Sequence, residues 1–407
     1  MISMKYSAKD RSFYFLFVMF AILEIVERTY ISFPSMTIIL AFGLYYWVYL
    51  TFRYVCLSNI HKEFDGVKII FLFLFWNITI IIRGLFDCND YWDYKTVLLN
   101  KGPYLLFPLS IFLVNKLGLL KKIFYFLLRY YLVLSMLFVR SEFWSNTGRI
   151  ICNLIPLSFL FIKKYRKWIL FFTIISIPFT WGARGWTLRA CYGLALALIF
   201  YLWKISFLTD KIVNIIFKLT YIICIIIPLI LVYMGYTGKF NVFAMDQYIS
   251  AKNEEDIADT RSLLYEKVND KLESSEKTWI GLGGISNYWD GFYADNNISE
   301  LRNKGRMVTE SGILNMYLYG GWIGAFLFSY LFWCSAYYGI YKSKNIICKL
   351  TGNFIIFRWV ISFVDEPEIW LCSNLMMYIF MGICLNRNLR DIPNDQWFRW
   401  FKTICKI

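Results

Sequence analysis

The sequence predicts an all-α polytopic membrane protein with about twelve transmembrane helices, and three observations predict it. Apolar residues make up 58% of the 407 residues, against roughly 45–50% in soluble globular proteins. Long apolar runs recur from end to end, separated by short charged breaks. The breaks are also alternately rich and poor in Lys and Arg. These features exclude a soluble enzyme and a nucleic-acid-binding domain, so the net charge of +15 is taken to report membrane topology and no nucleic-acid partner is expected.

The apolar runs give the number of spans, because a spanning helix needs roughly 20 apolar residues. The predicted spans cover residues 12–27, 34–57, 67–83, 96–115, 122–139, 150–162, 168–181, 186–203, 212–235, 310–341, 350–364 and 368–386. The pair 150–162 and 168–181 is short. A single long helix in its place would reverse the orientation of every later span.

The distribution of Lys and Arg predicts the orientation. With a cytoplasmic N-terminus, the segments on the cytoplasmic side hold 22 basic residues and the short loops on the opposite side hold five. Positive charge is enriched in cytoplasmic loops, so we expect both termini to be cytoplasmic.

Four regions follow from this topology: nine spans in residues 1–235, a large external loop in 236–309, three spans in 310–386 and a basic amphipathic cytoplasmic tail in 387–407. The tail contains an aromatic and basic stretch at 396–402 that is typical of an interfacial helix.

The external loop is too long to be a simple connection. Its middle predicts an amphipathic helix, because Ile257, Arg261, Leu264, Val268 and Leu272 recur with a helical period. A Gly-rich bend is predicted directly after this helix, at 279–284.

The candidate site residues are charged side chains near the external surface, where burial in an apolar span is costly. Arg184 stands between Gly182 and Gly185, and Arg189 follows one and a half turns later. Two guanidinium groups there suit an anionic headgroup, because the planar fork binds phosphate oxygens bidentately. The alternative is an arginine that snorkels to the interface beside a glycine turn.

Two further candidates lie in and after the loop. Arg261 occupies the apolar stripe of the predicted loop helix, where it must meet an anion; a structural salt bridge is the alternative. Glu310 opens the tenth span and could take a proton from a sugar hydroxyl. The alternative is that Glu310 only stabilises the helix, because a carboxylate is favoured at a helix N-terminus. Arg140 is a weaker external candidate. Ten Cys lie mostly in apolar runs and there is one His, so neither a metal site nor a cofactor is expected.

The order of these pieces resembles the O-antigen polymerase (Wzy) and O-antigen ligase superfamily of bacterial membrane glycosyltransferases. The matching segments are Ala183-Arg184-Gly185, Thr260-Arg261-Ser262, Gly281-Leu282-Gly283 and Glu310-Ser311. Ala183 stands where the family often has Ser. Ligases of the superfamily carry an external His at the position of Glu310, and this chain has none there, which favours the polymerase branch.

The resemblance implies a metal-independent transfer at the outer face of the cytoplasmic (inner) membrane, with undecaprenyl-diphosphate-linked oligosaccharide as substrate. It implies catalytic roles for Arg184, Arg261 and Glu310, and diphosphate or glycan contacts for Arg189 and Arg140. Tyr288, Trp289 and Tyr293 are expected to stack on sugars. Membrane lipids and a polysaccharide chain-length regulator are the other expected partners. A ligase and a polysaccharide transporter or flippase remain the alternatives, and a non-catalytic scaffold is a further one.

Overall fold

The computed structural model describes residues 8–27, 34–131, 150–179, 184–236, 260–287, 308–309, 311–365 and 371–404. Within these ranges the chain is helical, and its one β-bridge joins Phe64 to Asn386. The all-α membrane class is confirmed.

The helices run in the order in which the apolar runs predict them. The first α-helices are α1 (Ala8–Glu27), α2 (Pro34–Ser58), α3 (Val67–Phe86), α4 (Tyr91–Lys95), α5 (Gly102–Leu105), α6 (Leu117–Phe126), α9 (Lys163–Phe179), α10 (Arg184–Lys204) and α11 (Asp210–Tyr236). The later ones are α13 (Thr260–Ser274), α14 (Gly312–Tyr341), α15 (Ile346–Ile361), α16 (Leu371–Leu385), α17 (Arg387–Asp391) and α18 (Asn394–Ile404). Shorter 3-10 segments are η1 (Ile60–Glu63), η3 (Phe107–Asn115) and η5 (Ile155–Leu160), and π-helical segments are η2 (Thr96–Lys101) and η4 (Leu127–Tyr131).

Six helical stretches of the described residues are long and apolar enough to cross a membrane. They are Ile38–Ser58, Val67–Phe86, Tyr91–Asn115, Gly185–Lys204, Asp210–Met234 and Gly312–Tyr341. The apolar helices Ile150–Leu160 and Leu371–Leu385 are shorter than the roughly 20 residues of a full span. The number twelve therefore stays a prediction.

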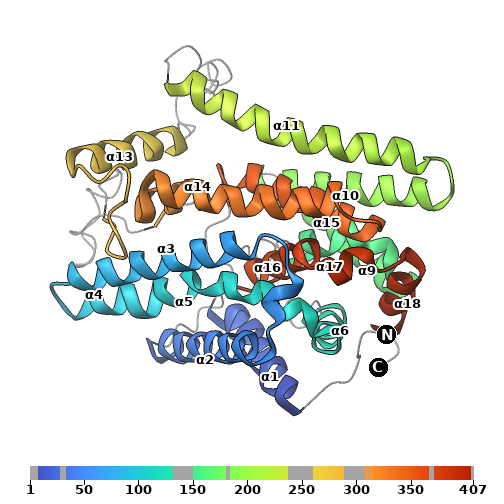
Figure 1. Cartoon of the computed structure of the whole chain (residues 1–407), viewed down its shortest axis with the longest axis horizontal. Helices are drawn as coiled ribbons and strands as arrows, with labels where there is room; N and C mark the ends of the chain where they lie inside the picture. Colours follow the sequence, from blue (N-terminus) through green and yellow to red (C-terminus); the bar gives the residue numbers. More distant parts are fainter. Residues whose placement is uncertain are drawn as a thin grey trace.

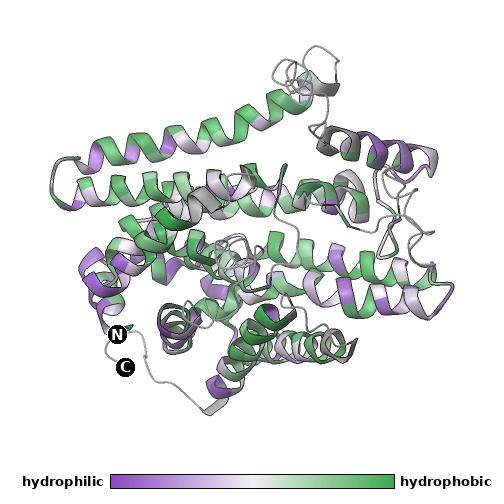
Figure 2. Ribbon diagram, turned by 180° about the vertical axis from the view of Figure 1, so that it is seen from behind, coloured by the Kyte–Doolittle hydropathy of each residue, from purple (hydrophilic) through white to green (hydrophobic). Residues whose placement is uncertain are grey.

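Most of the long helices run along the long axis of the molecule (Figure 1). One end carries α13 and α4 and is called the α13 end; the other carries α6, α17 and α18 and is called the α18 end. α16 forms the centre of the bundle, since all of its residues are buried. α11 lies along one side with only 11% of its apolar window buried, and its apolar surface runs along most of its length (Figure 2). In a bilayer this surface faces lipid.

The C-terminal helix α18 packs differently from the sequence-based expectation of an interfacial helix. Its aromatic face, with Trp397, Trp400 and Phe401, is buried in the protein. The Phe401 ring lies 5.4 Å from that of Phe161 and 6.0 Å from that of Phe124. The aromatic face of α18 thus anchors the helix to the bundle, because neighbouring helices offer rings to pack against, and only its charged face is left exposed.

Candidate functional site

Three helices meet at the turn that follows α15, at the α13 end. The buried guanidinium of Arg189, in the second turn of α10, forms an ion pair with Asp365, with 2.7 Å between Nη2 and Oδ2. Gly185, in the first turn of α10, lies against the same carboxylate: a Cβ at this position would be 2.8 Å from Asp365 Oδ2. The missing side chain at Gly185 therefore lets the start of α10 approach Asp365.

The start of α14 is tied to the same turn. Gly312 N donates to the carbonyl of Asp365 at 3.2 Å, and Ile313 N donates to that of Ser362 at 3.1 Å. Ser311 caps the helix by accepting from Leu314 N at 3.4 Å, and its hydroxyl donates to Ser362 O at 2.8 Å. The first backbone amides of α14 thus bond to the end of α15.

Helix α13 of the large loop packs on this turn through a tyrosine. The Tyr265 hydroxyl donates to Phe363 O at 2.7 Å and lies 3.1 Å from Ser311 Oγ. The predicted apolar stripe is confirmed where the structure describes it, since Leu264, Val268 and Leu272 are all buried. α13 is therefore fixed to the membrane helices.

The structure describes some of the predicted site residues and not others. Arg189 is described and lies at the junction. Arg184 is the first residue of α10 and Arg261 the second of α13, so their backbones are described while their side chains are not. The predicted residues that lie outside the described part of the chain are Glu310, Arg140, Tyr288, Trp289 and Tyr293.

Described residues close in sequence to the three predicted catalytic positions lie near one another. Arg184 directly precedes Gly185, Arg261 lies one turn before Tyr265, and Glu310 directly precedes Ser311. Gly185, Tyr265 and Ser311 all lie around the turn 362–365. The sequence treated Asp365 only as one acid in an external turn. The sequence signal for this ion pair was Arg189, a charged residue one and a half turns into an apolar span.

A second polar cluster lies beside this junction, around Arg358 near the end of α15. Its buried guanidinium donates to Asn153 Oδ1 at 3.0 Å, to Ser373 O at 3.1 Å and to Asn374 Oδ1 at 3.4 Å. Glu24 of α1 accepts from Cys372 N at 3.1 Å in the first turn of α16. The sequence alone did not single out Arg358, since its partners come from distant segments of the chain.

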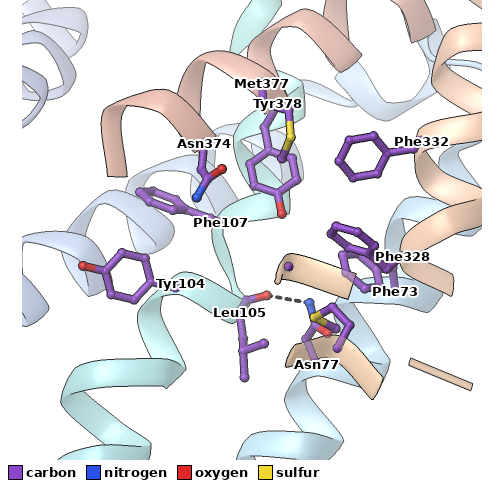
Figure 3. A pocket seen from close by; sticks show the side chains of 12 residues that line it. Phe73, Asn77, Tyr104, Leu105, Phe107, Phe328, Phe332, Asn374, Met377 and Tyr378 are labelled. Carbon is purple, nitrogen blue, oxygen red and sulfur yellow. Dashed lines mark hydrogen bonds between the residues drawn. The ribbon is translucent and has the colours of Figure 1, made fainter. Parts of the chain in front are cut away.

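An aromatic cavity lies between α3, η3, α14 and α16 (Figure 3). Its volume is about 40 Å³, which is room for only a few water molecules. In Figure 3, Phe73, Phe328 and Phe332 face Phe107 and Tyr378 across the space, and Asn77 donates to Leu105 O at 2.8 Å. Two of its lining residues bond to the turn 362–365 or to the Arg358 cluster.

Those two lining residues are Gly312 and Asn374. Gly312 bonds to the backbone of Asp365, whose side chain pairs with Arg189. Asn374 accepts from Arg358. The cavity is thus lined by one residue that bonds to the Asp365 backbone and by one that bonds to Arg358.

Helix α14 is broken inside its apolar run, which the sequence predicted as the single span 310–341. Gly321 has φ +63° and ψ −162°. In a straight helix Met316 and Gly324 would be about 12 Å apart, yet a Cβ on Gly324 would be 2.8 Å from Met316 O. Gly312 and Phe328 likewise line one cavity. The segment before Gly321 thus folds back beside the segment after it.

The predicted Gly-rich bend is confirmed. Its carbonyl groups accept hydrogen bonds from backbone amides next to the break in α14. Gly281 and Gly283 have φ +74° and +83°. Trp322 N and Ile323 N donate to the carbonyls of Thr278 and Trp279 at 3.0 and 3.2 Å. Such bonds replace those that the break removes, as backbone buried in a membrane protein requires.

Two cations hold this bend against α3 and η2. Arg83 Nη1 donates to Gly281 O at 3.1 Å. The buried ammonium of Lys101 donates to Ser286 Oγ at 2.7 Å and lies 4.3 Å from the centre of the Tyr319 ring. The large loop is thus anchored at both α13 and the bend.

Comparison of the chain with protein-family models, with curated proteins and with solved structures finds no match. In the described ranges, no group of three or more His, Cys, Asp or Glu side chains is arranged to hold a metal ion.

Proposed function

We propose that this chain is a bacterial membrane glycosyltransferase that joins undecaprenyl-diphosphate-linked oligosaccharide repeat units into O-antigen or a related surface polysaccharide. The observation that carries the proposal is that Gly185, Tyr265 and Ser311, which are close in sequence to Arg184, Arg261 and Glu310, all lie around the turn 362–365. Two arginine positions and a carboxylate position beside one turn suit a substrate with an anionic head and a sugar hydroxyl.

The chemistry needs charge neutralisation at the leaving group. The acceptor hydroxyl oxygen forms a bond to the anomeric carbon, the bond from that carbon to the diphosphate oxygen breaks, and the diphosphate leaves with the electron pair. Arg184 and Arg261 are assigned to the diphosphate, because charge-assisted bidentate bonds stabilise the developing negative charge.

The other candidate residues are assigned as follows. Arg189 supports the site through Asp365, which fixes the start of α10 against the start of α14. Glu310, the residue before Ser311, takes the proton of the acceptor hydroxyl. Arg140, Tyr288, Trp289 and Tyr293 are assigned to the glycan. The reaction places the α13 end at the outer face of the inner membrane and both termini in the cytoplasm.

One observation favours a second candidate, a polysaccharide transporter. Discontinuous helices are common at the binding sites of transporters, and α14 is broken at Gly321. In this chain, however, backbone bonds from the 278–284 bend close the break, which makes the broken segment part of a fixed wall.

The test is to incubate the purified protein with undecaprenyl-diphosphate-linked repeat units and to separate the products on a gel. The proposal predicts a ladder of glycans for the wild type and no ladder for Arg184→Ala at equal protein level. Single-step transfer to a different acceptor would indicate a ligase. Movement of intact substrate across a vesicle membrane without products would indicate the transporter.

A further inference from the structure

Folding gathers lysines and arginines from three segments at the α18 end. They are called the basic rim and comprise Lys163, Lys164, Arg166 and Lys167 of α9, Lys204 of α10 and Lys402 of α18. Figure 2 shows polar colouring at this end, and also on α13 at the opposite end. The positive-inside rule accounts for basic residues on one side of a membrane, but it does not require that they be brought together.

Aromatic packing holds the rim together. The Phe398 ring of α18 lies 6.1 Å from that of Phe200 and 6.3 Å from that of Trp203, in the last turn of α10. The Arg166 guanidinium lies 5.0 Å from the centre of the Phe159 ring, which in turn lies 5.1 Å from that of Tyr201. These contacts fix α9, η5, α10 and α18 relative to one another.

Two members of the rim lie close to a third. The ammonium of Lys204 is close enough to Lys402 and Arg166 for both to act on it unfavourably. Of the two nearby acids, Asp210 accepts from Trp203 Nε1 at 2.6 Å, and Asp395 is 4.0 Å from Arg399. Among the residues that the structure describes, no carboxylate forms an ion pair with a member of the rim.

Exposed apolar side chains flank the same cations. Ile162 and Trp168 of the α9 region are 37% and 45% exposed, and Ile205 and Phe207 after α10 are 53% and 73% exposed. A soluble anion makes no favourable contact with these apolar side chains. A phospholipid, in contrast, packs its acyl chains against them and places its phosphate among the cations. Clusters of basic residues at membrane-helix ends bind anionic headgroups in this way.

We infer that the basic rim binds the headgroup of an anionic phospholipid, with its phosphate between Arg166, Lys204 and Lys402. This site is independent of the proposed glycosyl transfer, because it lies at the opposite end of the bundle (Figure 1). It would fix α18 and the α9–α10 pair in the membrane through one shared lipid.

The test measures binding of phosphatidylglycerol to the purified full-length protein in neutral detergent, by native mass spectrometry and by thermal unfolding. The double variant Lys204→Gln/Lys402→Gln is compared with Lys62→Gln/Lys68→Gln, which removes two exposed lysines from the same end. Phosphatidylcholine and inorganic phosphate serve as the two comparison ligands.

We expect phosphatidylglycerol to raise the melting temperature of the wild type and of the control, and the rim variant to bind it about tenfold more weakly. Equal binding by both double variants would overturn the inference. So would equal stabilisation by phosphatidylcholine, which excludes recognition of the anionic headgroup, or by inorganic phosphate, which excludes a lipid.

Discussion

Two groups of basic side chains, the buried arginines Arg189 and Arg358 at one end of the bundle and the basic rim at the other, are held in opposite ways. At the α13 end, Arg189 and Arg358 are buried and each meets defined oxygen atoms of neighbouring helices. At the α18 end most members of the basic rim are exposed and form no ion pairs with described residues. Buried guanidinium groups must have fixed partners because desolvation is costly, whereas exposed cations are free to bind a mobile headgroup.

The orientation of these two ends gives the largest expected difference. Cys88 lies between α3 and α4 at the α13 end. A membrane-impermeant thiol reagent applied to intact cells is expected to label Cys88 and to leave a Lys344→Cys variant unlabelled at position 344 until the cells are permeabilised. Peptide mass spectrometry measures the labelled fraction of Cys88 and of the cysteine at position 344. Labelling of position 344 in intact cells with Cys88 protected would invert the topology.

The pH dependence of this labelling has a defined sign. Burial, followed by the charges of Asp93, Asp87 and Asp90, raises the pKa of the Cys88 thiol. The thiolate is the reactive form, so a raised pKa leaves a smaller thiolate fraction near pH 7. The labelling rate should rise steadily from pH 7 to pH 9; a rate that is already constant over that range would contradict the raised pKa.

Removal of a buried guanidinium should cost the most stability. Arg358→Ala leaves Asn153, Asn374 and the Ser373 carbonyl without the donor that they share. We expect the free energy of unfolding, measured by steric trapping in bicelles, to fall by about 3 kcal/mol or more. A loss no larger than that of an exposed lysine would show that the cluster does not stabilise the fold.

A single added methyl group tests the contact between α10 and Asp365. Gly185→Ala places a Cβ 2.8 Å from Asp365 Oδ2, so the carboxylate must shift away from Arg189. We expect the free energy of unfolding to fall by roughly 1–3 kcal/mol. In an Asp365→Ala background the added cost should fall, because the 2.8 Å contact with the carboxylate is removed and only the 3.0 Å contact with the Cβ of residue 365 remains; an undiminished cost would place its origin elsewhere.

An exposed ion pair at the α18 end should give the smallest effect. Lys344 lies 3.0 Å from Asp391, and their side chains are 77% and 59% exposed. Lys344→Gln should change the free energy of unfolding by less than about 0.5 kcal/mol, because solvent screens exposed pairs. A change as large as that of Arg358→Ala would remove the distinction between the two ends.

The sequence predicted those features that depend on local pattern. The helical period of Leu264, Val268 and Leu272 predicted α13 and its buried face, and the glycines at 281 and 283 predicted the bend. Hydropathy could not detect the break at Gly321, because the residues on both sides are apolar whether the chain continues or folds back. The Arg189–Asp365 pair was also missed, since it depends on the packing of α10 against the turn after α15.

The aromatic face of α18 illustrates the same limit. Its pattern of aromatic and basic residues is equally suited to a lipid interface and to a hydrophobic groove between helices. Packing of Trp400 and Phe401 against Phe124 decides between them, and no local pattern contains that contact.

The central claim is that the arginines of the α13 end hold a lipid-linked diphosphate. The most direct measurement is the dissociation constant of undecaprenyl diphosphate for the purified protein and its variants. We expect Arg184→Ala to weaken binding by about tenfold or more, as loss of a charge-assisted bidentate contact requires, and Lys204→Gln/Lys402→Gln to leave it unchanged. Unchanged binding in Arg184→Ala together with weakened binding in the rim variant would contradict the claim.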